Sequence, residues 1–154
     1  MRKMLFTGAS GFLGYNIRPI LEKSYDVHTI GLTDDDDIKI NIAKEVPPIN
    51  THYDVVLHAA GKAHMVPKTE EEKKVFYDVN YQGTVNLCTA LEKVGVPKSL
   101  VFISTVAVYG CDTGELAVVI KILFTDAHKR IINQLECKHR FPAFHQGNRI
   151  ICQE

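Results

Sequence analysis

The sequence has little cysteine, no excess of either charge and no long apolar run, and each absence narrows the class of protein. A formal net charge of zero over 154 residues argues against binding nucleic acid or an anionic membrane surface through overall basicity. No apolar run approaches the roughly 18 residues that span a bilayer, and the chain enters a short predicted strand directly after its basic start. We therefore expect no signal peptide, no membrane span and a cytoplasmic protein.

The four cysteines are widely scattered and show no paired spacing, so we interpret them as reduced thiols. They are Cys88, Cys111, Cys137 and Cys152. Two of them lie near His139 and His145 in a region whose side chains suit zinc, but the spacings match no standard zinc finger. We expect no metal site.

A predicted strand, a glycine-rich turn and a predicted helix follow one another at the start of the chain. Residues 3–7 read as a short buried strand, and apolar residues recur at helical spacing over 12–21. Gly8 permits a tight turn, Gly11 lets the backbone approach a pyrophosphate, and Gly14 lets the helix lie close to the strand. The helix N-terminus offers N–H groups to phosphates. The sequence therefore predicts a dinucleotide site here, with a glycine-rich loop without ligand as the alternative.

Strands and helices alternate along the next ninety residues. The further predicted strands are residues 26–30, 38–42, 53–61 and 99–103. A helix is predicted over 69–94, because Thr69 and Glu72 have capping-box spacing and Gly95 and Pro97 terminate the pattern. This alternation predicts an α/β fold with a doubly wound, mostly parallel sheet.

Four consecutive aspartates, residues 34–37, follow the second predicted strand, where we expect a solvated turn. Many nicotinamide-binding domains carry an acidic residue at the end of this strand that bonds the ribose hydroxyls. That position falls on Gly31, which has no side chain to do so. The sequence shows no arginine nearby to hold a 2′-phosphate, and the aspartates would oppose one. We therefore expect NAD in preference to NADP.

Taken together, four stretches resemble motifs of the extended short-chain dehydrogenase/reductase family, in its NAD-dependent epimerase/dehydratase branch that works on nucleotide sugars. They are residues 7–14, 58–61, 79–84 and 102–110. All four lie within residues 1–115, which we interpret as an NAD-binding Rossmann domain.

The resemblance implies where NAD is contacted. The implied residues are Gly8, Ser10, Gly11, Phe12, Leu13, Gly14, Asn41, Ile42, His58, Ala59, Ala60, Gly61 and Asn80. Asn41 and Ile42 would lie by the adenine, and residues 59–61 by the phosphates and ribose. Asn80 is implied to be mainly architectural, and a packed core histidine is the alternative for His58.

The resemblance also implies a reaction in which NAD transiently accepts a hydride from a sugar carbon, with a tyrosine as base and a lysine that lowers its pKa. Thr105, or its neighbour Ser104, would hold the substrate oxygen; a strand-end hydroxyl bonded to backbone is the alternative for Thr105. The expected Tyr-x-x-x-Lys pair is missing, because position 130 is Arg130 and no tyrosine follows Tyr109.

Residues 116–154 form an atypical tail that is rich in basic side chains, whereas residues 1–115 carry an acidic excess. The tail is interpreted either as out-of-frame or truncated sequence, or as a genuine segment whose apolar run 116–124 supplies a strand or helix. We expect a nucleotide-sugar epimerase/dehydratase by descent that is inactive as this chain. The alternative is a non-catalytic dinucleotide-binding module, a sensor or partner subunit. The helix over 69–94 offers a surface for a homodimer.

Overall fold

The computed structural model describes residues 1–62, 67–103 and 120–123, and within these ranges six strands form a single sheet. The strands are β1 (Arg2–Thr7), β2 (Tyr25–Gly31), β3 (Ile38–Lys39), β4 (Val55–His58), β5 (Ser99–Ile103) and β6 (Ile120–Leu123). Their spatial order is β3-β2-β1-β4-β5-β6, and β1 to β5 are all parallel. The sheet therefore winds outward from β1 in both directions, which confirms the predicted doubly wound α/β fold.

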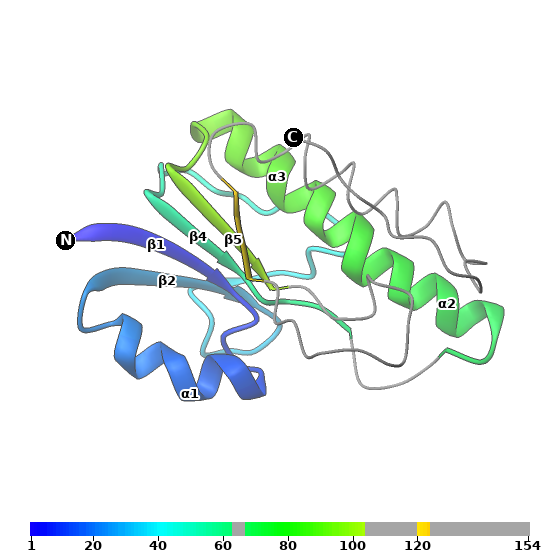
Figure 1. Cartoon of the computed structure of the whole chain (residues 1–154). Coiled ribbons are helices and arrows are strands. Elements are labelled where there is room, and N and C mark those ends of the chain that lie inside the picture. The colour runs from blue at the N-terminus through cyan, green and yellow to red at the C-terminus, as the bar shows by residue number, and fades with distance from the viewer. Residues whose placement is uncertain (63–66, 104–119, 124–154) are drawn as a thin grey trace, which may run out of the picture.

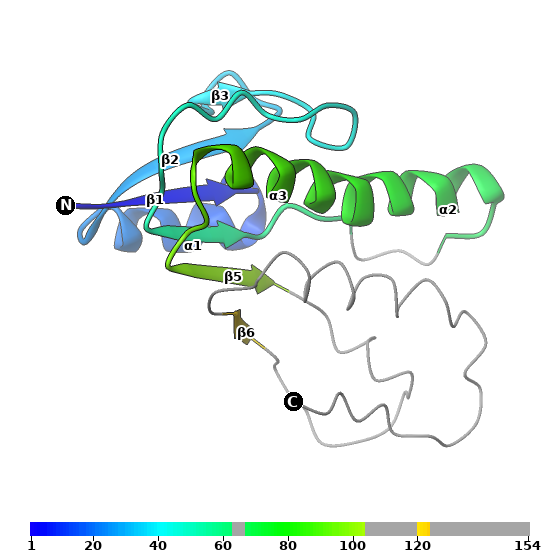
Figure 2. The same ribbon diagram turned by 90° about the horizontal axis from the view of Figure 1, so that it is seen from above.

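Helices cover both faces of this sheet (Figure 1). They are α1 (Phe12–Leu21), α2 (Glu70–Tyr77), the π-helix η1 (Asp78–Gln82) and α3 (Gly83–Val94). Successive side chains of a strand point to opposite faces. Accordingly, Leu5 of β1 packs in one buried cluster with Leu87 of α3, whereas its neighbour Phe6 packs in a second cluster with Ile17 and Leu21 of α1. Figure 2 shows α1 and α3 on either side of the strands.

The helix predicted over 69–94 is confirmed at both ends. The Thr69 hydroxyl accepts from the backbone N–H of Glu72 at 3.2 Å, and the Glu72 carboxylate accepts from the backbone N–H of Thr69 at 3.3 Å. Gly95 follows α3 with a φ of 107°, a conformation that favours glycine. Between these ends the structure contains a π-turn, η1, that the sequence pattern did not predict.

The third and fourth strands are shorter than predicted. β3 ends at Lys39 because Asn41 begins a turn: its side-chain oxygen accepts from Ala43 N at 3.0 Å, and its carbonyl oxygen accepts from Lys44 N at 2.9 Å. β4 ends at His58, so the small residues 59–61 belong to the loop that follows it.

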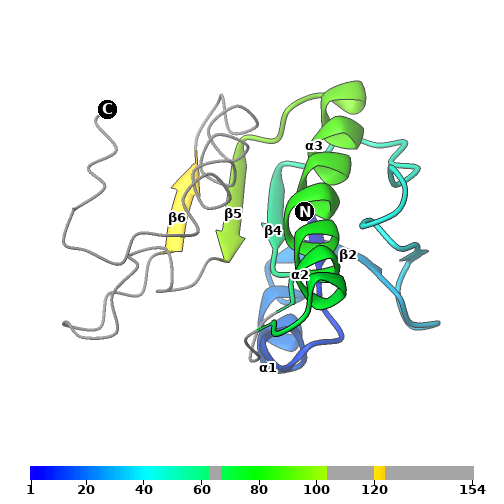
Figure 3. The ribbon, with the colours of Figure 1, turned by 90° about the vertical axis from the view of Figure 1, so that its right-hand side faces the viewer.

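β6 lies antiparallel to β5 at the edge of the sheet, with Leu100 opposite Leu123 and Ile103 opposite Ile120 (Figure 3). Four residues of the apolar run 116–124 thus form a strand, as one interpretation of the tail expected. The rest of residues 116–154, including Arg130 and the tail cysteines and histidines, lies outside the described residues. None of the helices in the described ranges has the length and apolar content needed to cross a bilayer.

Candidate functional site

The glycine-rich turn brings the chain after β1 against the chain after β4. Gly8 has a φ of 82°, and a Cβ atom built on it would lie 2.6 Å from Ala60 N and 2.9 Å from Ala60 Cα. A Cβ on Gly14 would lie 2.5 Å from backbone atoms of Ala9. The tight turn predicted at Gly8 is confirmed, and Gly14 allows close approach to the turn after β1 rather than to the strand itself.

The N-terminus of α1 is open, whereas the N-terminus of α2 is closed by the protein's own side chains. Gly11 precedes α1 and offers no capping side chain, and the first turn of α1 contains no acidic residue. By contrast, α2 has the Thr69 capping box and three glutamates in its first turn. Since the first N–H groups of a helix lack intrahelical acceptors, α1 presents free donors and a partial positive charge. This arrangement fits a bound phosphate group.

His58 lies at the end of β4 and is buried, with 1% of its surface exposed. Its Nδ1 atom is 2.5 Å from Thr7 Oγ1 and its Nε2 atom is 2.9 Å from Thr84 Oγ1. The Thr84 hydroxyl donates to the carbonyl oxygen of Asn80 at 2.8 Å, so its oxygen accepts from Nε2–H of His58. We accordingly assign the Nε2–H tautomer, in which Nδ1 accepts from the Thr7 hydroxyl. Burial lowers the pKa of His58 to about 4, so the ring is neutral.

Both ring nitrogens of His58 are therefore engaged within the core. The ring has no nitrogen to offer a ligand, and the structure favours the packed-histidine alternative over a direct cofactor contact. Its effect on the site is indirect. The Thr7 hydroxyl, which donates to Nδ1 of His58, accepts from the backbone N–H of Ala60 at 3.3 Å. His58 thus helps to fix the position of the loop that follows β4.

Asn80, in the π-turn, holds the other end of this loop. Its side-chain oxygen accepts from Lys62 N at 2.7 Å, and its side-chain nitrogen donates to Lys62 O at 3.0 Å. A Cβ atom on Gly61 would lie 3.2 Å from the same Asn80 oxygen. Both polar atoms of the Asn80 side chain are thus used to hold backbone, which agrees with an architectural role.

The residues expected near the adenine lie just beyond the carboxyl end of β3. The carbonyl oxygen of Ile42 accepts from the Asn86 side chain of α3 at 2.7 Å. The Ile42 side chain packs against the buried cluster on that face, and a Cβ on Gly83 would lie 3.3 Å from its Cγ1 atom. Asn41 precedes it in the turn described above. The candidate cofactor residues thus gather at the carboxyl ends of β1, β3 and β4, where open α/β sheets bind ligands.

Three further candidates lie on the turn and the start of α1. Ser10 is exposed, as are Phe12, at 89%, and Leu13, at 38%. Their assignment to the cofactor stays a prediction. The catalytic candidates Ser104 and Thr105 lie outside the described residues.

Arg18 of α1 lies within electrostatic range of the aspartate run, although the sequence shows no arginine beside it. The pKa of this guanidinium is raised chiefly by its hydrogen bond to Glu22, and the charges of Asp37 and Asp36 raise it further. The guanidinium is nevertheless held by Glu22, with Nε 2.7 Å from the carboxylate.

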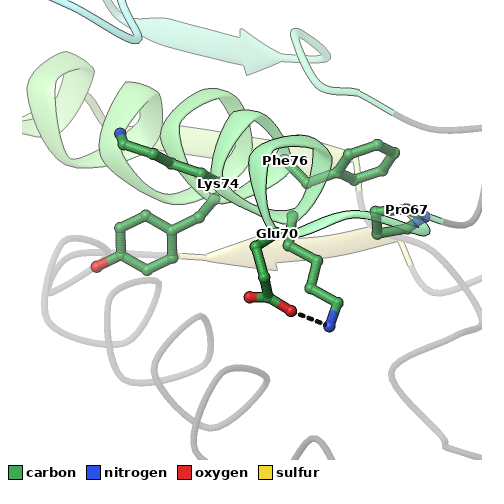
Figure 4. A pocket seen from close by; sticks show the side chains of 6 residues that line it. Pro67, Glu70, Lys74 and Phe76 are labelled. Atoms are coloured by element: carbon green, nitrogen blue, oxygen red, sulfur yellow. Dashed lines mark hydrogen bonds and ion pairs between the residues drawn. The ribbon is translucent and has the colours of Figure 1, made fainter.

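A separate surface hollow lies along α2 (Figure 4). It is lined by Pro67, Glu70, Lys73, Lys74, Phe76 and Tyr77. Lys73 and Glu70 form an exposed ion pair at 2.6 Å across it. None of its lining residues comes from the glycine-rich turn or from residues 58–61, so this hollow is distinct from the candidate cofactor site. Within the described ranges no group of His, Cys, Asp and Glu side chains could hold a metal ion.

The parallel sheet, the glycine-rich turn and the open helix after β1 define the class of a Rossmann-type dinucleotide-binding domain. Residues 4–121 match the family model described as NAD dependent epimerase/dehydratase family. The chain belongs to that family.

Two curated relatives illustrate the similarity. Over 122 residues the chain is 34% identical to UDP-glucose 4-epimerase of Vibrio cholerae. The aligned region covers 71% of this chain and 36% of that protein. Over 117 residues it is 33% identical to N-acetyl-alpha-D-glucosaminyl-diphospho-ditrans,octacis-undecaprenol 4-epimerase of Escherichia coli O157:H7, covering 70% of this chain and 33% of that protein. The chain thus spans about a third of the length of these relatives.

Solved structures share the fold. A UDP-N-acetylglucosamine 4-epimerase from Methanobrevibacter ruminantium, in complex with UDP-N-acetylmuramic acid, aligns with a TM-score of 0.60 at 21% identity, covering 90% of this chain and 49% of that one. A mutant uronate dehydrogenase from Agrobacterium tumefaciens, complexed with NAD, aligns with a TM-score of 0.53 at 25% identity, covering 68% and 41%.

Proposed function

We propose that this chain binds NAD at the carboxyl ends of β1 and β4 and is the dinucleotide-binding part of a nucleotide-sugar epimerase/dehydratase. The observation that carries the proposal is the contrast between two helix starts. The N–H groups at the start of α1 lack a side-chain cap and an acidic first turn, whereas α2 has both. Membership of an NAD-dependent family supports the choice of cofactor, and the names of the relatives support the nucleotide-sugar class of substrate.

We assign a part of NAD to each segment that borders the site. The backbone from Gly8 to Gly14 binds the pyrophosphate, the loop 59–61 lies along the ribose, and Asn41 with Ile42 borders the adenine. Bound NAD supplies a hydride acceptor. Thr105, with Ser104 as its neighbour, would orient the sugar oxygen.

We further propose that this chain by itself does not sustain turnover. The reaction implied by the family resemblance needs a tyrosine that acts as base and a lysine that lowers the pKa of this tyrosine. The sequence has Arg130 near the expected position of the tyrosine and no tyrosine after Tyr109.

One observation favours a second candidate, a non-catalytic dinucleotide-binding module. Residues 120–123 of the tail pair with β5 and extend the sheet, as a segment with a structural purpose would. This candidate predicts tight NAD binding, no turnover and a tail that resists proteolysis.

The test is a calorimetric titration of the full chain with NAD, together with an assay of UDP-glucose epimerisation. We expect saturable NAD binding and no turnover, and limited proteolysis of residues 116–154 then separates the two candidates. A chain that binds neither NAD nor NADP at millimolar concentration would overturn both. Robust epimerisation would overturn the proposal that the chain is inactive alone.

A further inference from the structure

The end of β2 lacks the acidic side chain that nicotinamide-binding domains commonly place against the adenosine ribose. In this chain β2 ends at Gly31. The position is well placed for such contact, because Ile30 pairs with Thr7 and its carbonyl oxygen accepts from Gly8 N at 3.4 Å. A carboxylate at this point would therefore lie beside the glycine-rich turn.

The carboxylate of Asp36 occupies the space into which a side chain at position 31 would project. A Cβ atom built on Gly31 would lie 2.6 Å from Cγ and 2.7 Å from Oδ1 of Asp36, and closer still to Oδ2. Any side chain at position 31 would collide with this group. The glycine at the end of β2 and the position of Asp36 are thus two parts of one arrangement.

The surrounding loop holds Asp36 through one of its two oxygens. Oδ2 accepts from the backbone N–H of Thr33 at 3.0 Å and from the Thr33 hydroxyl at 2.7 Å. The next residue, Asp37, anchors the loop to β2, since its Oδ2 accepts from Thr29 N at 2.8 Å and from Thr29 Oγ1 at 3.0 Å.

The second oxygen, Oδ1, stays open within the part of the chain that the structure describes. Asp36 is only 9% exposed, yet no donor within the described residues bonds to its Oδ1. No fully sequestered polar side-chain atom in those ranges lacks a partner, so Oδ1 still reaches the surface. A nearly buried carboxylate with one open acceptor is suited to accept a hydrogen bond from a ligand hydroxyl.

We propose that Asp36 replaces the missing acidic side chain at position 31 and accepts a hydrogen bond from the adenosine ribose of NAD. The inference rests on the proposed NAD binding. The same carboxylate opposes a 2′-phosphate, so Asp36 is a specificity-determining residue for NAD over NADP. Arg18 does not reverse this preference, because its guanidinium is engaged by Glu22.

The other aspartates of the run do not share this position. Asp34 pairs with Lys39, Asp37 bonds to Thr29, and Asp35 is exposed. Asp35→Ala is therefore a matched control, which removes one negative charge from the same loop and leaves Gly31 untouched.

The test measures the dissociation constants of NAD and NADP by calorimetry on the full chain and on three variants. They are Asp36→Ala, Asp35→Ala and the double variant Gly31→Asp/Asp36→Ala, which moves the carboxylate onto β2. Circular dichroism verifies that each variant is folded. We expect Asp36→Ala to weaken NAD binding about tenfold and to reduce the preference for NAD over NADP. Asp35→Ala should bind both nucleotides like the wild type. The double variant should regain the preference for NAD.

Two results would refute the role of Asp36 while leaving NAD binding intact. One is an NAD/NADP ratio for Asp36→Ala equal to that of Asp35→Ala. The other requires that Asp36→Ala is folded and has lost its preference for NAD. In that case, a folded Gly31→Asp/Asp36→Ala variant with the same NAD/NADP ratio as Asp36→Ala would refute the role. A wild-type chain that binds neither nucleotide overturns the proposed function itself.

Discussion

The Thr7 hydroxyl and Nδ1 of His58 lie 2.5 Å apart at the point where β1 and β4 end side by side. From this contact, hydrogen bonds lead through the His58 ring to Thr84 and on to the backbone of Asn80. The carboxyl end of the sheet is thereby tied to the helix on one face. In this series Nδ1 of His58 accepts from the Thr7 hydroxyl. A proton added to Nδ1 would therefore leave a buried positive charge facing a hydroxyl that now donates to it.

Acidification should destabilise the protein through His58. Burial lowers the pKa of this residue to about 4 in the folded state, while an unfolded histidine titrates near 6.5. Between those values the unfolded state binds more protons, so the free energy of unfolding falls as pH falls. At about 1.4 kcal/mol per pH unit, the loss from pH 7 to pH 4 amounts to about 3 kcal/mol. Above pH 6.5 this contribution to the pH dependence vanishes.

Urea unfolding from pH 4 to 7.5 measures this dependence in the wild type and in His58→Gln, which should show a shallower slope. His52→Gln is the matched control, because that side chain is exposed and, among the described residues, bonds the carbonyl oxygen of Val96 alone. An NMR titration of the wild-type His58 ring gives the same answer if His58→Gln fails to fold. Titration of that ring near pH 6.5 would contradict the argument.

Gly11→Asp should separate stability from NAD binding. The backbone at Gly11 has φ −78° and ψ 172°, which any residue adopts, and aspartate is a favoured N-cap. A Cβ there would lie 3.3 Å from Gly8 O, so a small adjustment suffices. We expect the melting temperature to stay level or rise, while NAD affinity measured by calorimetry falls at least tenfold, since the carboxylate takes the N–H donors and repels phosphate.

The neutral variant Gly11→Asn controls for the loss of donors, and its NAD affinity should lie between the wild type and Gly11→Asp. Equal NAD affinity for the wild type and Gly11→Asp would place the pyrophosphate elsewhere.

Thr69→Ala should destabilise the start of α2 without affecting NAD binding. The substitution leaves the backbone N–H of Glu72 without its side-chain acceptor, and loss of such a cap costs about 1 kcal/mol. Urea denaturation measures the change, and Thr69→Ser should retain wild-type stability because its hydroxyl can still cap. A stability equal to the wild type in Thr69→Ala would mean that α2 does not unfold with the rest of the domain.

Asn80→Ala should release the loop after β4. The backbone N–H of Lys62 loses an acceptor at 2.7 Å, so we expect its amide to exchange with solvent at least tenfold faster by NMR. A net hydrogen bond contributes about 1 kcal/mol, so the domain should remain folded. Gln82→Ala serves as control, because that side chain bonds Asn86 and makes no hydrogen bond to the described loop residues 59–62. Unchanged exchange at Lys62 would show that the loop holds its position without Asn80.

Local features of the fold could be predicted from the sequence because their causes lie within a few residues. The tight turn at Gly8, the capping box at Thr69 and the helix stop at Gly95 each follow from a backbone or side-chain property of nearby residues. The parallel sheet was also predictable, since strands alternated with helices. Asn41, by contrast, cut the third strand short through a side-chain bond that apolar spacing does not reveal.

The site depends on contacts between distant segments, which periodicity does not encode. The position of the Asp36 carboxylate beside Gly31 arises from a loop that is bonded to β2 through Asp37 and Thr29. The engagement of both His58 nitrogens required Thr7 and Thr84 to meet the same ring. Roles that need Ser104 and Thr105 stay predictions.

The helical run from Glu70 to Val94 contains two regions with different sources of stability. No residue of α2 is buried, whereas seven residues of α3 are, and the π-helix η1 separates the two. Figure 1 shows α2 and α3 as one continuous run. The first part relies on its cap and on exposed ion pairs such as Lys74 with Asp78, and salt screens such pairs. High ionic strength should therefore fray α2 from its N-terminal end while α3 stays intact, and amide exchange in 1 M salt would reveal this difference. One continuous helical run would then unfold in two stages. The stability of α2 would depend on the salt concentration of the solvent, and the stability of α3 on its packing in the core.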